Sequence, residues 1–429
     1  MNSDPDRAGH LRPKARHLAL PPVAIAPGAV PLCLTALLLA LALVAAAPAS
    51  PVAGSNGPRQ TRPPEAAPHR TALEGTAPRW TAARPGYPWS FPTDHWAHPG
   101  YRNEWWYFTG HLRVEGEEDP AFGYQFTFFR VGLSPRAVGW NSSWDTRGLI
   151  MGHASITDLR RGRHFFSEVL YRETPLLGGF SEPGDSLLAW SLGPPGTDGR
   201  WQLLFDDGVF TFRMEDDAQR TAFVLQARPA RPLIFQGPGG YSKKGAGGEA
   251  ASLYYSFTRL TTRGTLTTGG EARRVEGESW MDREFSSNQL EPNQAGWDWF
   301  SLQLSDGRDL MLYLLRDRRG RVDFARGTLV ASGGKVRYLT AADWTLAVED
   351  SWKSARTGAV YPARWRLQLS DADIDVLLEP LLPDQENVSG RSGVHYWEGA
   401  VKITDRTGAA AGRGYVELTG YGEGSRPPI

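Results

Sequence analysis

The segment NEWWYFTGHL, residues 103–112, places the carboxylate of Glu104 at the head of an otherwise aromatic and apolar run. Successive side chains of a β-strand point to opposite faces, so Glu104 shares a face with Trp106. The next apolar run, GYQFTFFR (residues 123–130), ends in Arg130. Because an unpaired buried charge is costly, we expect Glu104 and Arg130 to form an ion pair inside a β-barrel. In the alternative reading, each group reaches solvent at a strand end.

The same arrangement of an acid at the start of one apolar run and an arginine at the end of the next recurs about two hundred residues later. Asp298 opens the aromatic run in GWDWFSLQL (residues 296–304), and Arg316 ends DLMLYLLR (residues 309–316). The same parity argument predicts an ion pair between Asp298 and Arg316. Because the acid and the base recur together, the pairs also fit a structural role in a repeated scaffold.

A second pair of similar segments follows in each half of the chain. The segment YYSFTRLTTRGTL (residues 254–266) resembles YWEGAVKITDRTG (residues 396–408), and each opens with two aromatic residues. We infer a tandem duplication of one barrel-like module, divided in the polar stretch SSNQLEPNQ (residues 286–294).

Alternating apolar and polar residues dominate the remainder of the chain, in short runs separated by Gly, Asp, Asn and Pro clusters. This pattern predicts an all-β protein built from two tandem antiparallel β-barrels. Further examples are ASITDL (154–159), WQLLF (201–205), GVFTFRM (208–214) and WRLQLS (365–370).

The first 49 residues are typical of a secretory signal peptide. A basic segment precedes the apolar run PLCLTALLLALALV (residues 31–44), and small residues around Ala49 suggest a cleavage site. An uncleaved membrane anchor is the alternative. We therefore expect a periplasmic or secreted protein. The only cysteine, Cys33, lies within the apolar run, so the mature chain has no cysteine chemistry.

Four regions are predicted along the chain. After the signal peptide comes a leader rich in Pro, Ala and Gly, whose composition favours disorder. The regions are the signal peptide (1–49), the disordered leader (50–84), the first barrel domain (85–287) and the second barrel domain (288–429).

Charge and motif patterns exclude several classes of function. Lysine plus arginine and aspartate plus glutamate both total 47, and no basic stripe is present, so we expect no nucleic-acid partner. His95 and His98 lack a third ligand at a diagnostic spacing, so no metal site is predicted, and no cofactor is predicted either. The glycine-rich segment GPGGYSKKGAGG (237–248) lacks the phosphate-binding spacing and is interpreted as a mobile loop over a barrel mouth.

The segment VEGESWMDREFSS (residues 275–287) carries an unusual row of acids. On an extended chain, Asp282 and Glu284 lie on one face with Glu278 and Trp280. Such a row repels itself unless some carboxyls are protonated or paired. Either the strand contains a bulge or the acids line a polar cavity. A carboxyl group of raised pKa beside a tryptophan is a candidate for acid/base catalysis, and a solvated loop edge is the alternative.

Taken together, these segments resemble the AttH/CrtC family, in the branch described as predicted secreted hydrolases and often labelled carotenoid 1,2-hydratase. The resemblance extends from about Pro88 to Tyr421. It implies lipocalin-like barrels and hydrophobic polyene substrates held within or between the domains. The motifs that carry it are HPGYRNEWWYFTGHL, GYQFTFFR, GHASITD, GYSKKG, GESWMDREFSSNQL, GWDWFSLQL and GYVELTGY.

Hydration of an isoprenoid double bond requires an acid, aromatic faces beside the carbocation, and a positioned water. We therefore assign candidate catalytic roles to Asp282, Glu284 and Tyr255. Candidate substrate-binding residues are Trp280, Trp106, Glu104, Arg130, His153, Asp298 and Arg316. His153 is also explained by a structural hydrogen bond. Carotenoid hydratases of this family carry Asp-His-x-Trp, where this chain has Arg283 and Phe285 after Asp282, so those two roles do not transfer.

Three hypotheses for the function follow from the sequence. The first is an exported enzyme that hydrates or hydrolyses a lipid or polyene by acid/base chemistry. The second is a non-catalytic lipocalin-type carrier of a hydrophobic small molecule. The third is a structural component of the cell envelope, whose barrels are filled by aromatic side chains.

Overall fold

The computed structural model of the protein describes residues 79–135, 142–248 and 250–422. The predicted signal peptide, its cleavage site near Ala49 and the predicted leader up to residue 78 lie outside these residues. Among the described residues, no helix combines the length and the apolar character needed to cross a membrane.

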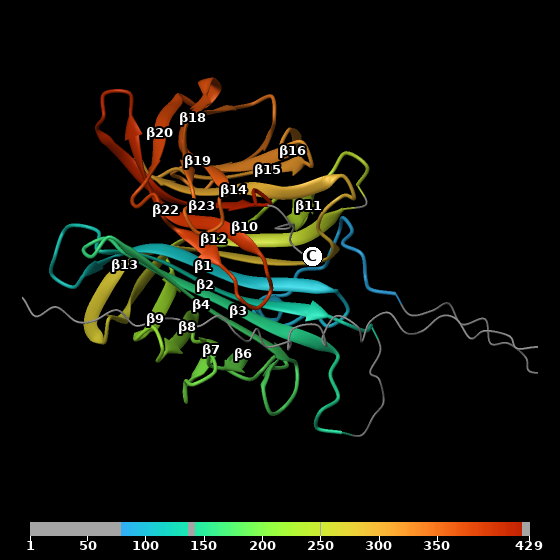
Figure 1. Ribbon diagram of the computed structural model, residues 1–429. Coiled ribbons are helices and arrows are strands. Elements are labelled where there is room, and N and C mark those ends of the chain that lie inside the picture. The colour runs from blue at the N-terminus through green and yellow to red at the C-terminus, as the bar shows by residue number, and fades with distance from the viewer. Residues whose placement is uncertain (1–78, 136–141, 249, 423–429) are drawn as a thin grey trace, which may run out of the picture. The chain divides into compact units, whose positions relative to one another are not determined.

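The first half of the described chain forms a thirteen-stranded antiparallel sheet that curls into a nearly closed barrel (Figure 1). Its main path runs β4-β3-β2-β1-β13-β12-β9-β8-β7-β6-β5, and β10 and β11 also pair with β12. The strands are β1 (Asn103–Val114), β2 (Phe122–Gly132), β3 (Gly148–Asp158), β4 (Arg163–Arg172), β5 (Gly178–Phe180), β6 (Leu187–Leu192), β7 (Arg200–Asp206), β8 (Val209–Asp216), β9 (Thr221–Pro229), β10 (Ile234–Phe235), β11 (Tyr241–Lys243), β12 (Ala251–Thr268) and β13 (Glu271–Asn288).

The second half forms a ten-stranded antiparallel sheet with the shape of a half-barrel. Its path runs β17-β16-β15-β14-β23-β22-β20-β19-β18, and β21 pairs with β22. The strands are β14 (Gln294–Leu304), β15 (Asp309–Asp317), β16 (Val322–Val330), β17 (Val336–Thr340), β18 (Thr345–Lys353), β19 (Val360–Leu369), β20 (Ile374–Pro380), β21 (Glu386–Val388), β22 (His395–Asp405) and β23 (Ala410–Thr419). The only helical elements of the described chain are single 3-10 turns: η1 (Thr93–His95), η2 (Pro238–Gly240) and η3 (Ser370–Ala372).

The predicted all-β fold and its internal repeat are confirmed. The strand order β2-β1-β13-β12 in the first sheet matches β15-β14-β23-β22 in the second. In both sheets the acid-led strand therefore pairs with the returning strand of the double-aromatic hairpin. The sheet changes between Asn288 and Gln294, inside the polar stretch that the sequence suggested as the division.

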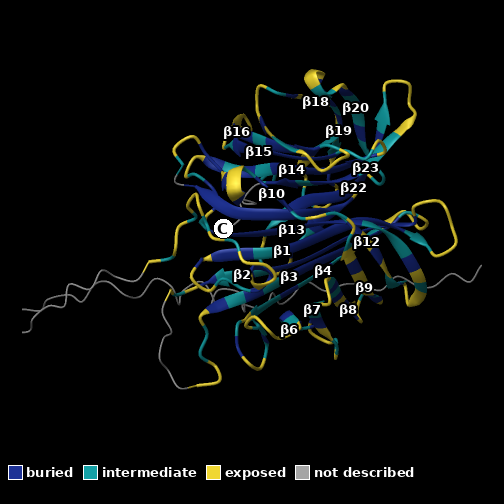
Figure 2. Cartoon of the chain, turned by 180° about the vertical axis from the view of Figure 1, so that it is seen from behind, coloured by how far each residue is buried: buried dark blue, intermediate teal, exposed yellow. Residues whose placement is uncertain are grey.

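The described chain contains four apolar clusters, three large ones and a small one around Phe285. Side chains such as Trp106 and Phe108 fill the first barrel, and Phe300 and Trp365 lie in the second. The outward-facing residues of the same strands form a third cluster between the sheets, which includes Tyr107. Because side chains alternate along each strand, one set fills the barrel interior and the other set forms the buried contact between the two sheets. Figure 2 shows this as dark blue strands where the two sheets meet, with exposed loops at the rims.

Candidate functional site

A cavity of about 90 Å³ lies between the outer faces of the two barrels. Both sheets contribute walls, and two acids of β13, Asp282 and Glu284, face into it, whereas Glu278 lies outside it and pairs with Arg413. It is lined by Trp105, Tyr107, Gln125, Thr127, Phe129, Lys244, Tyr254, Asp282, Glu284, Gln289, Leu290, Trp297, Trp299, Tyr313, Leu315, Tyr396, Glu398 and Glu417. The cavity therefore combines aromatic walls with four carboxyl groups and one ammonium group.

Asp282 is the most closely surrounded acid of this cavity. Its Oδ2 accepts a hydrogen bond from the Tyr254 hydroxyl at 2.5 Å. Its Oδ1 accepts from the Ser256 hydroxyl at 2.5 Å and from Nε1 of Trp280 at 2.7 Å. Burial raises the pKa of Asp282 to about 7, although these three donors favour the charged form. A carboxyl group that titrates near neutrality, in a fixed orientation, is suited to proton transfer.

Glu284, two residues further along the same face, is paired with the ammonium group of Lys244. Nζ of Lys244 lies 2.7 Å from Oε1 of Glu284. The same ammonium lies 5.2 Å from the ring centre of Tyr254 and 4.6 Å from that of Tyr313. Burial alone lowers the pKa of Lys244, but the Glu284 carboxylate leaves it raised above its ordinary value. The glycine-rich segment that carries Lys244 therefore supplies a cation to the cavity, where the sequence suggested a mobile loop.

Tyr255 does not join Asp282 and Glu284, although the sequence grouped the three as catalytic candidates. It points into the first barrel, where its hydroxyl lies 2.6 Å from Nδ1 of His95. Burial lowers the pKa of His95 to about 3, so this imidazole is neutral near pH 7. The separation follows from strand parity, because neighbouring side chains point to opposite faces. The tyrosine that contacts Asp282 is Tyr254.

Glu104 lies at the centre of a buried charge cluster inside the first barrel. The predicted pair with Arg130 is confirmed, with Nη1 of Arg130 3.3 Å from Oε1 of Glu104. A second guanidinium, from Arg283, lies 2.5 Å from Oε2. The backbone N–H of His98 donates to both carboxylate oxygens. Burial alone raises the pKa of Glu104, but Arg283, His98 and Arg130 hold it well below its ordinary value.

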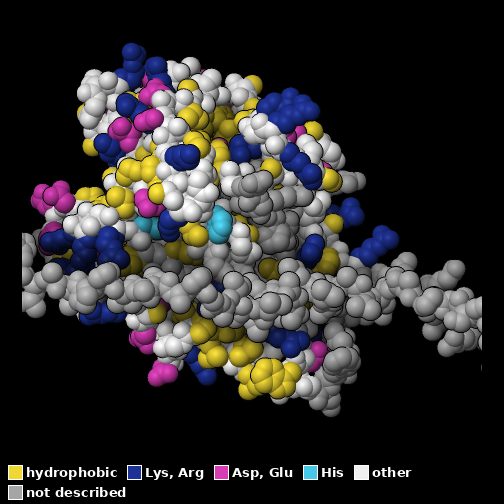
Figure 3. All heavy atoms as spheres, in the orientation of Figure 1, with side chains coloured by type: hydrophobic (Ala, Val, Ile, Leu, Met, Phe, Trp, Pro, Cys, Tyr) yellow, Lys and Arg dark blue, Asp and Glu magenta, His cyan; other side chains and the backbone are white. Residues whose placement is uncertain are grey.

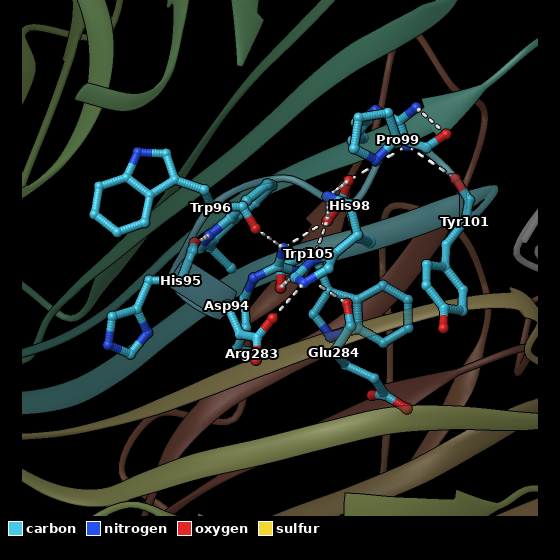
Figure 4. A network of polar contacts seen from close by, with 12 residues as sticks. Asp94, His95, Trp96, His98, Pro99, Tyr101, Trp105, Arg283 and Glu284 are labelled. Atoms are coloured by element: carbon cyan, nitrogen blue, oxygen red, sulfur yellow. Dashed lines mark hydrogen bonds and ion pairs between the residues drawn. The ribbon is translucent and has the colours of Figure 1, made fainter. Parts of the chain in front are cut away.

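Arg283 points away from the interface cavity and toward this cluster, as strand parity requires. Figure 4 shows its guanidinium among Trp96, His98 and Trp105, with the Glu284 carboxylate directed the other way. The guanidinium also lies 3.9 Å from the ring centre of Trp106. Trp106 is thus a wall of the first barrel and does not reach the interface cavity.

The predicted pair of Asp298 and Arg316 is also confirmed, inside the second barrel. Nε of Arg316 lies 2.8 Å from Oδ1 of Asp298, and the Tyr421 hydroxyl donates to both carboxylate oxygens at 3.0 Å. The Arg316 guanidinium covers the Tyr421 ring at 3.8 Å. Each barrel therefore holds a buried acid paired with arginine beside an aromatic ring, with two guanidinium groups on Glu104 and one on Asp298.

His153 joins the two sheets beside the cavity. Its Nδ1 lies 2.7 Å from the hydroxyl of Tyr396, a residue of β22 that lines the cavity. Burial lowers the pKa of His153 to about 3. His153 therefore positions a cavity wall as a neutral hydrogen-bonding group.

The polar cavity residues that sequence reasoning missed include Lys244, Tyr254, Glu398 and Glu417. The two glutamates carry the signal that identified Glu104, an acid within an apolar alternating run. They occur in YWEGAVKI (396–403) and GYVELTGY (414–421), where the alternating apolar pattern predicts that each acid lies within a strand.

The fold and this site define a class of all-β proteins in which two related barrels pack side by side over a buried acidic and aromatic cavity. The family model described as AttH-like matches residues 82–421, and the chain belongs to this family. A search of the curated proteins finds none that matches the chain.

Two crystal structures are similar to this chain. An AttH-type protein from Nitrosomonas europaea is 34% identical over 80% of this chain and 99% of its own, with a TM-score of 0.68. Kievitone hydratase from Nectria haematococca is 15% identical over 80% of this chain and 96% of its own, with a TM-score of 0.54. At 15% identity, the similarity to kievitone hydratase shows a shared fold.

Proposed function

We propose that this protein is an exported enzyme that adds water to a carbon–carbon double bond of a hydrophobic lipid or isoprenoid substrate at the interface cavity. The observation that carries the proposal is the position of Asp282. It is a buried carboxyl with a pKa near 7, held by three donors, among aromatic walls.

In the proposed reaction, the Asp282 carboxylic acid gives its proton to one carbon of the double bond. The neighbouring carbon becomes a carbocation, which the faces of Trp105 and Trp299 stabilise. A water molecule bonds to that carbon and releases a proton to the Asp282 carboxylate. The acid is thereby restored, and the product is an alcohol that contains one added water.

The size of the cavity limits which part of the substrate it holds. Its volume of about 90 Å³ is well below the roughly 300 Å³ at which pockets for drug-sized ligands begin. We therefore expect it to take the reacting end of a substrate, with side-chain movement to admit the rest.

Arg283 and Phe285, which replace His and Trp of the hydratase pattern, do not weaken the proposal. Arg283 points into the first barrel, and Phe285 packs with Tyr101 and Leu253. Neither side chain lines the cavity. The two positions that depart from the pattern therefore lie outside the cavity lining around Asp282.

The proposal is tested by incubating the purified protein with lycopene, or with a lipid extract of the native host, in water labelled with ¹⁸O. We expect a product heavier by one labelled water, detected by mass spectrometry. Asp282→Asn should reduce its formation at least a hundredfold, and Tyr254→Phe should reduce it about tenfold. The control Asp343→Asn, which removes a surface carboxylate, should have no effect.

Two results would contradict the proposal. Unlabelled substrates recovered intact from every incubation would exclude hydration. Lipid that co-purifies with the protein but is never converted, by the wild type or by Asp282→Asn, would indicate a carrier.

A further inference from the structure

Glu398 and Glu417 face each other directly on β22 and β23 and both line the interface cavity. Side chains directly opposite on antiparallel strands lie about 5 Å apart at Cβ. Glu398 is 1% exposed, and its Oε1 is buried without a hydrogen-bond partner. Its Oε2 accepts a long hydrogen bond, 3.3 Å, from Nδ2 of Asn387. Among the ion pairs of the described residues, none involves either glutamate.

Two carboxylates so placed repel each other, and their burial further disfavours the doubly charged form. Burial and the neighbouring Glu417 raise the pKa of Glu398 well above its ordinary value, although the Tyr107 and Tyr396 hydroxyls favour its charged form. Burial likewise raises the pKa of Glu417 to about 7. At least one proton therefore remains on the pair near neutral pH, unless a positive charge enters.

The first barrel shows how the equivalent position is neutralised. In the register of the sheets, Glu284 lies opposite Trp105, the residue after Glu104. Glu417 lies opposite Trp299, the residue after Asp298. The internal repeat thus makes Glu284 and Glu417 counterparts. Glu284 is neutralised by the Lys244 ammonium, which sits between tyrosine rings.

Lys244 lines the same cavity as Glu398 and Glu417, but among the described residues it is paired with Glu284 and no lysine or arginine forms an ion pair with either glutamate. In the first barrel Glu284 lies opposite Tyr254, whereas in the second barrel its counterpart Glu417 lies opposite Glu398. The second barrel therefore has two carboxyl groups where the first has one. Tyr107, Trp297 and Tyr396 supply aromatic faces around them. Carboxylates among aromatic rings are the surroundings that bind ammonium groups in proteins.

We propose that Glu398 and Glu417 bind the protonated amine of a hydrophobic ligand, so that the cavity selects substrates bearing an ammonium group. The inference deepens the proposed function, since it assumes that the ligand occupies the cavity that contains Asp282. The ammonium displaces the proton held by the glutamate pair, and its hydrocarbon portion lies against the aromatic walls.

Binding should therefore release protons and strengthen as pH rises from about 6 to 8. The other charged and titratable groups that line the cavity or act on the glutamate pair are Asp282, Glu284, Lys244, Tyr107, Tyr254, Tyr313, Tyr396 and Tyr415. Lys244 is already paired, and the tyrosines remain neutral in this range. Asp282 titrates near pH 7, so the variant Asp282→Asn separates its contribution from that of the pair.

The test is calorimetric titration of the full protein with octylamine, 1-octanol and octanoate, three probes of equal chain length. We expect octylammonium to bind at least tenfold more tightly than 1-octanol, and octanoate more weakly than either. Glu398→Gln and Glu417→Gln should each reduce octylammonium affinity at least tenfold. Glu115→Gln, a surface control that pairs only with Arg274, should leave it unchanged. Circular dichroism melting verifies that each variant is folded.

Equal affinity for octylammonium and 1-octanol would overturn the inference, as would folded glutamine variants that bind octylammonium normally. In that case the pair is a carboxyl–carboxylate pair that retains its proton. The test separates this inference from the proposed function. Selective amine binding without hydration of any substrate would leave the inference standing alone, and hydration without amine selectivity would leave only the function.

Discussion

At the scale of single residues, Asp282 makes the stability of the protein depend on pH. Its pKa is raised from 3.8 to about 7 in the folded state, so the folded protein binds this proton more tightly than the unfolded chain. Between these two values the folded state holds more protons, and the free energy of unfolding therefore decreases as pH rises. This contribution is complete below pH 3.8 and is lost by about pH 7.

The variant Asp282→Asn should remove this dependence. A pKa unit corresponds to about 1.4 kcal/mol, so we expect the wild type to lose roughly 2–4 kcal/mol more than the variant between pH 5 and pH 8. Urea unfolding at pH 5, 6, 7 and 8 measures the difference. Glu398 and Glu417 act in the same direction and remain in both proteins, so only the difference between the curves is informative. Parallel curves would show that Asp282 titrates normally.

Arg283 is expected to be a structural residue, because it neutralises Glu104 deep inside the first barrel. Both side chains are fully buried and lie 2.5 Å apart. Arg283→Met leaves the carboxylate with Arg130 as its remaining guanidinium and should lower the free energy of unfolding by about 3–5 kcal/mol. The double variant Arg283→Met, Glu104→Gln should recover part of this loss. Arg274→Met, at an exposed surface pair, should cost less than about 1 kcal/mol. Chemical unfolding compares all three.

How far the site could be predicted depended on the sequence separation of its members. Strand parity within one hairpin predicted the pair of Glu104 and Arg130. It could not supply Arg283, because the pairing of β1 with β13 joins residues almost 180 positions apart. Parity also separates Tyr254 from Tyr255, but it does not say which of the two faces the barrel interior.

At the scale of elements, the β12–β13 hairpin is the part of the fold that positions the acids. The sequence offered a bulge or a cavity as alternative explanations of the acidic row. The structure shows the cavity. Asp282 and Glu284 lie in a regular stretch of β13, opposite Ser256 and Tyr254, and the extra residue between Phe257 and Leu260 belongs to the partner strand β12. The cavity could not be placed from the hairpin alone, since its other wall belongs to the second sheet.

Gly277 permits the close approach of β13 to β1. A Cβ atom at this position would lie 2.0 Å from the carbonyl oxygen of His111, which is backbone and has little freedom to move. Gly277→Ala should therefore lower the free energy of unfolding by about 1–3 kcal/mol, as overpacking does in other proteins. Gly333→Ala is the matched control, because nothing lies within 4 Å of its added methyl group. Equal thermal midpoints for the two variants would show that the strands adjust without strain.

At the scale of the whole described molecule, the two sheets share a buried interface that the pattern of either half could not reveal. Outward-facing aromatic residues on alternating strands are ordinary on an exposed barrel wall, and only the packing of the second sheet converts them into a core. The charged side chains outside this interface are interspersed by sign on the face shown in Figure 3. The acids that matter for the proposed function are consequently gathered at the one surface where the barrels meet.

Asp309 of β15 is the polar contact that links the sheets most directly. Its carboxylate accepts from the Thr258 hydroxyl at 2.8 Å and Nε of Arg259 at 2.8 Å, and lies 3.0 Å from Nη1 of Arg231. All three partners belong to the first half of the chain. Burial raises the pKa of Asp309 above its ordinary value, although the two guanidinium groups oppose this shift. The charged form of Asp309 is therefore stabilised by Arg231 and Arg259, which both belong to the first half of the chain.

Replacement of this carboxylate by an amide, Asp309→Asn, should loosen the barrels from each other while leaving each core intact. The amide cannot neutralise two partly exposed guanidinium groups, and we expect a loss of about 2–3 kcal/mol. Because the loss falls on the interface, the single calorimetric unfolding transition expected for the wild type should separate into two. Asp371→Asn, whose carboxylate pairs with Arg337 at the surface, is the control and should keep one transition. If Asp309→Asn instead lowers the midpoint of one sharp transition, the barrels unfold as a unit, and the coupling between them resides in the aromatic interface around Tyr107 and Trp299.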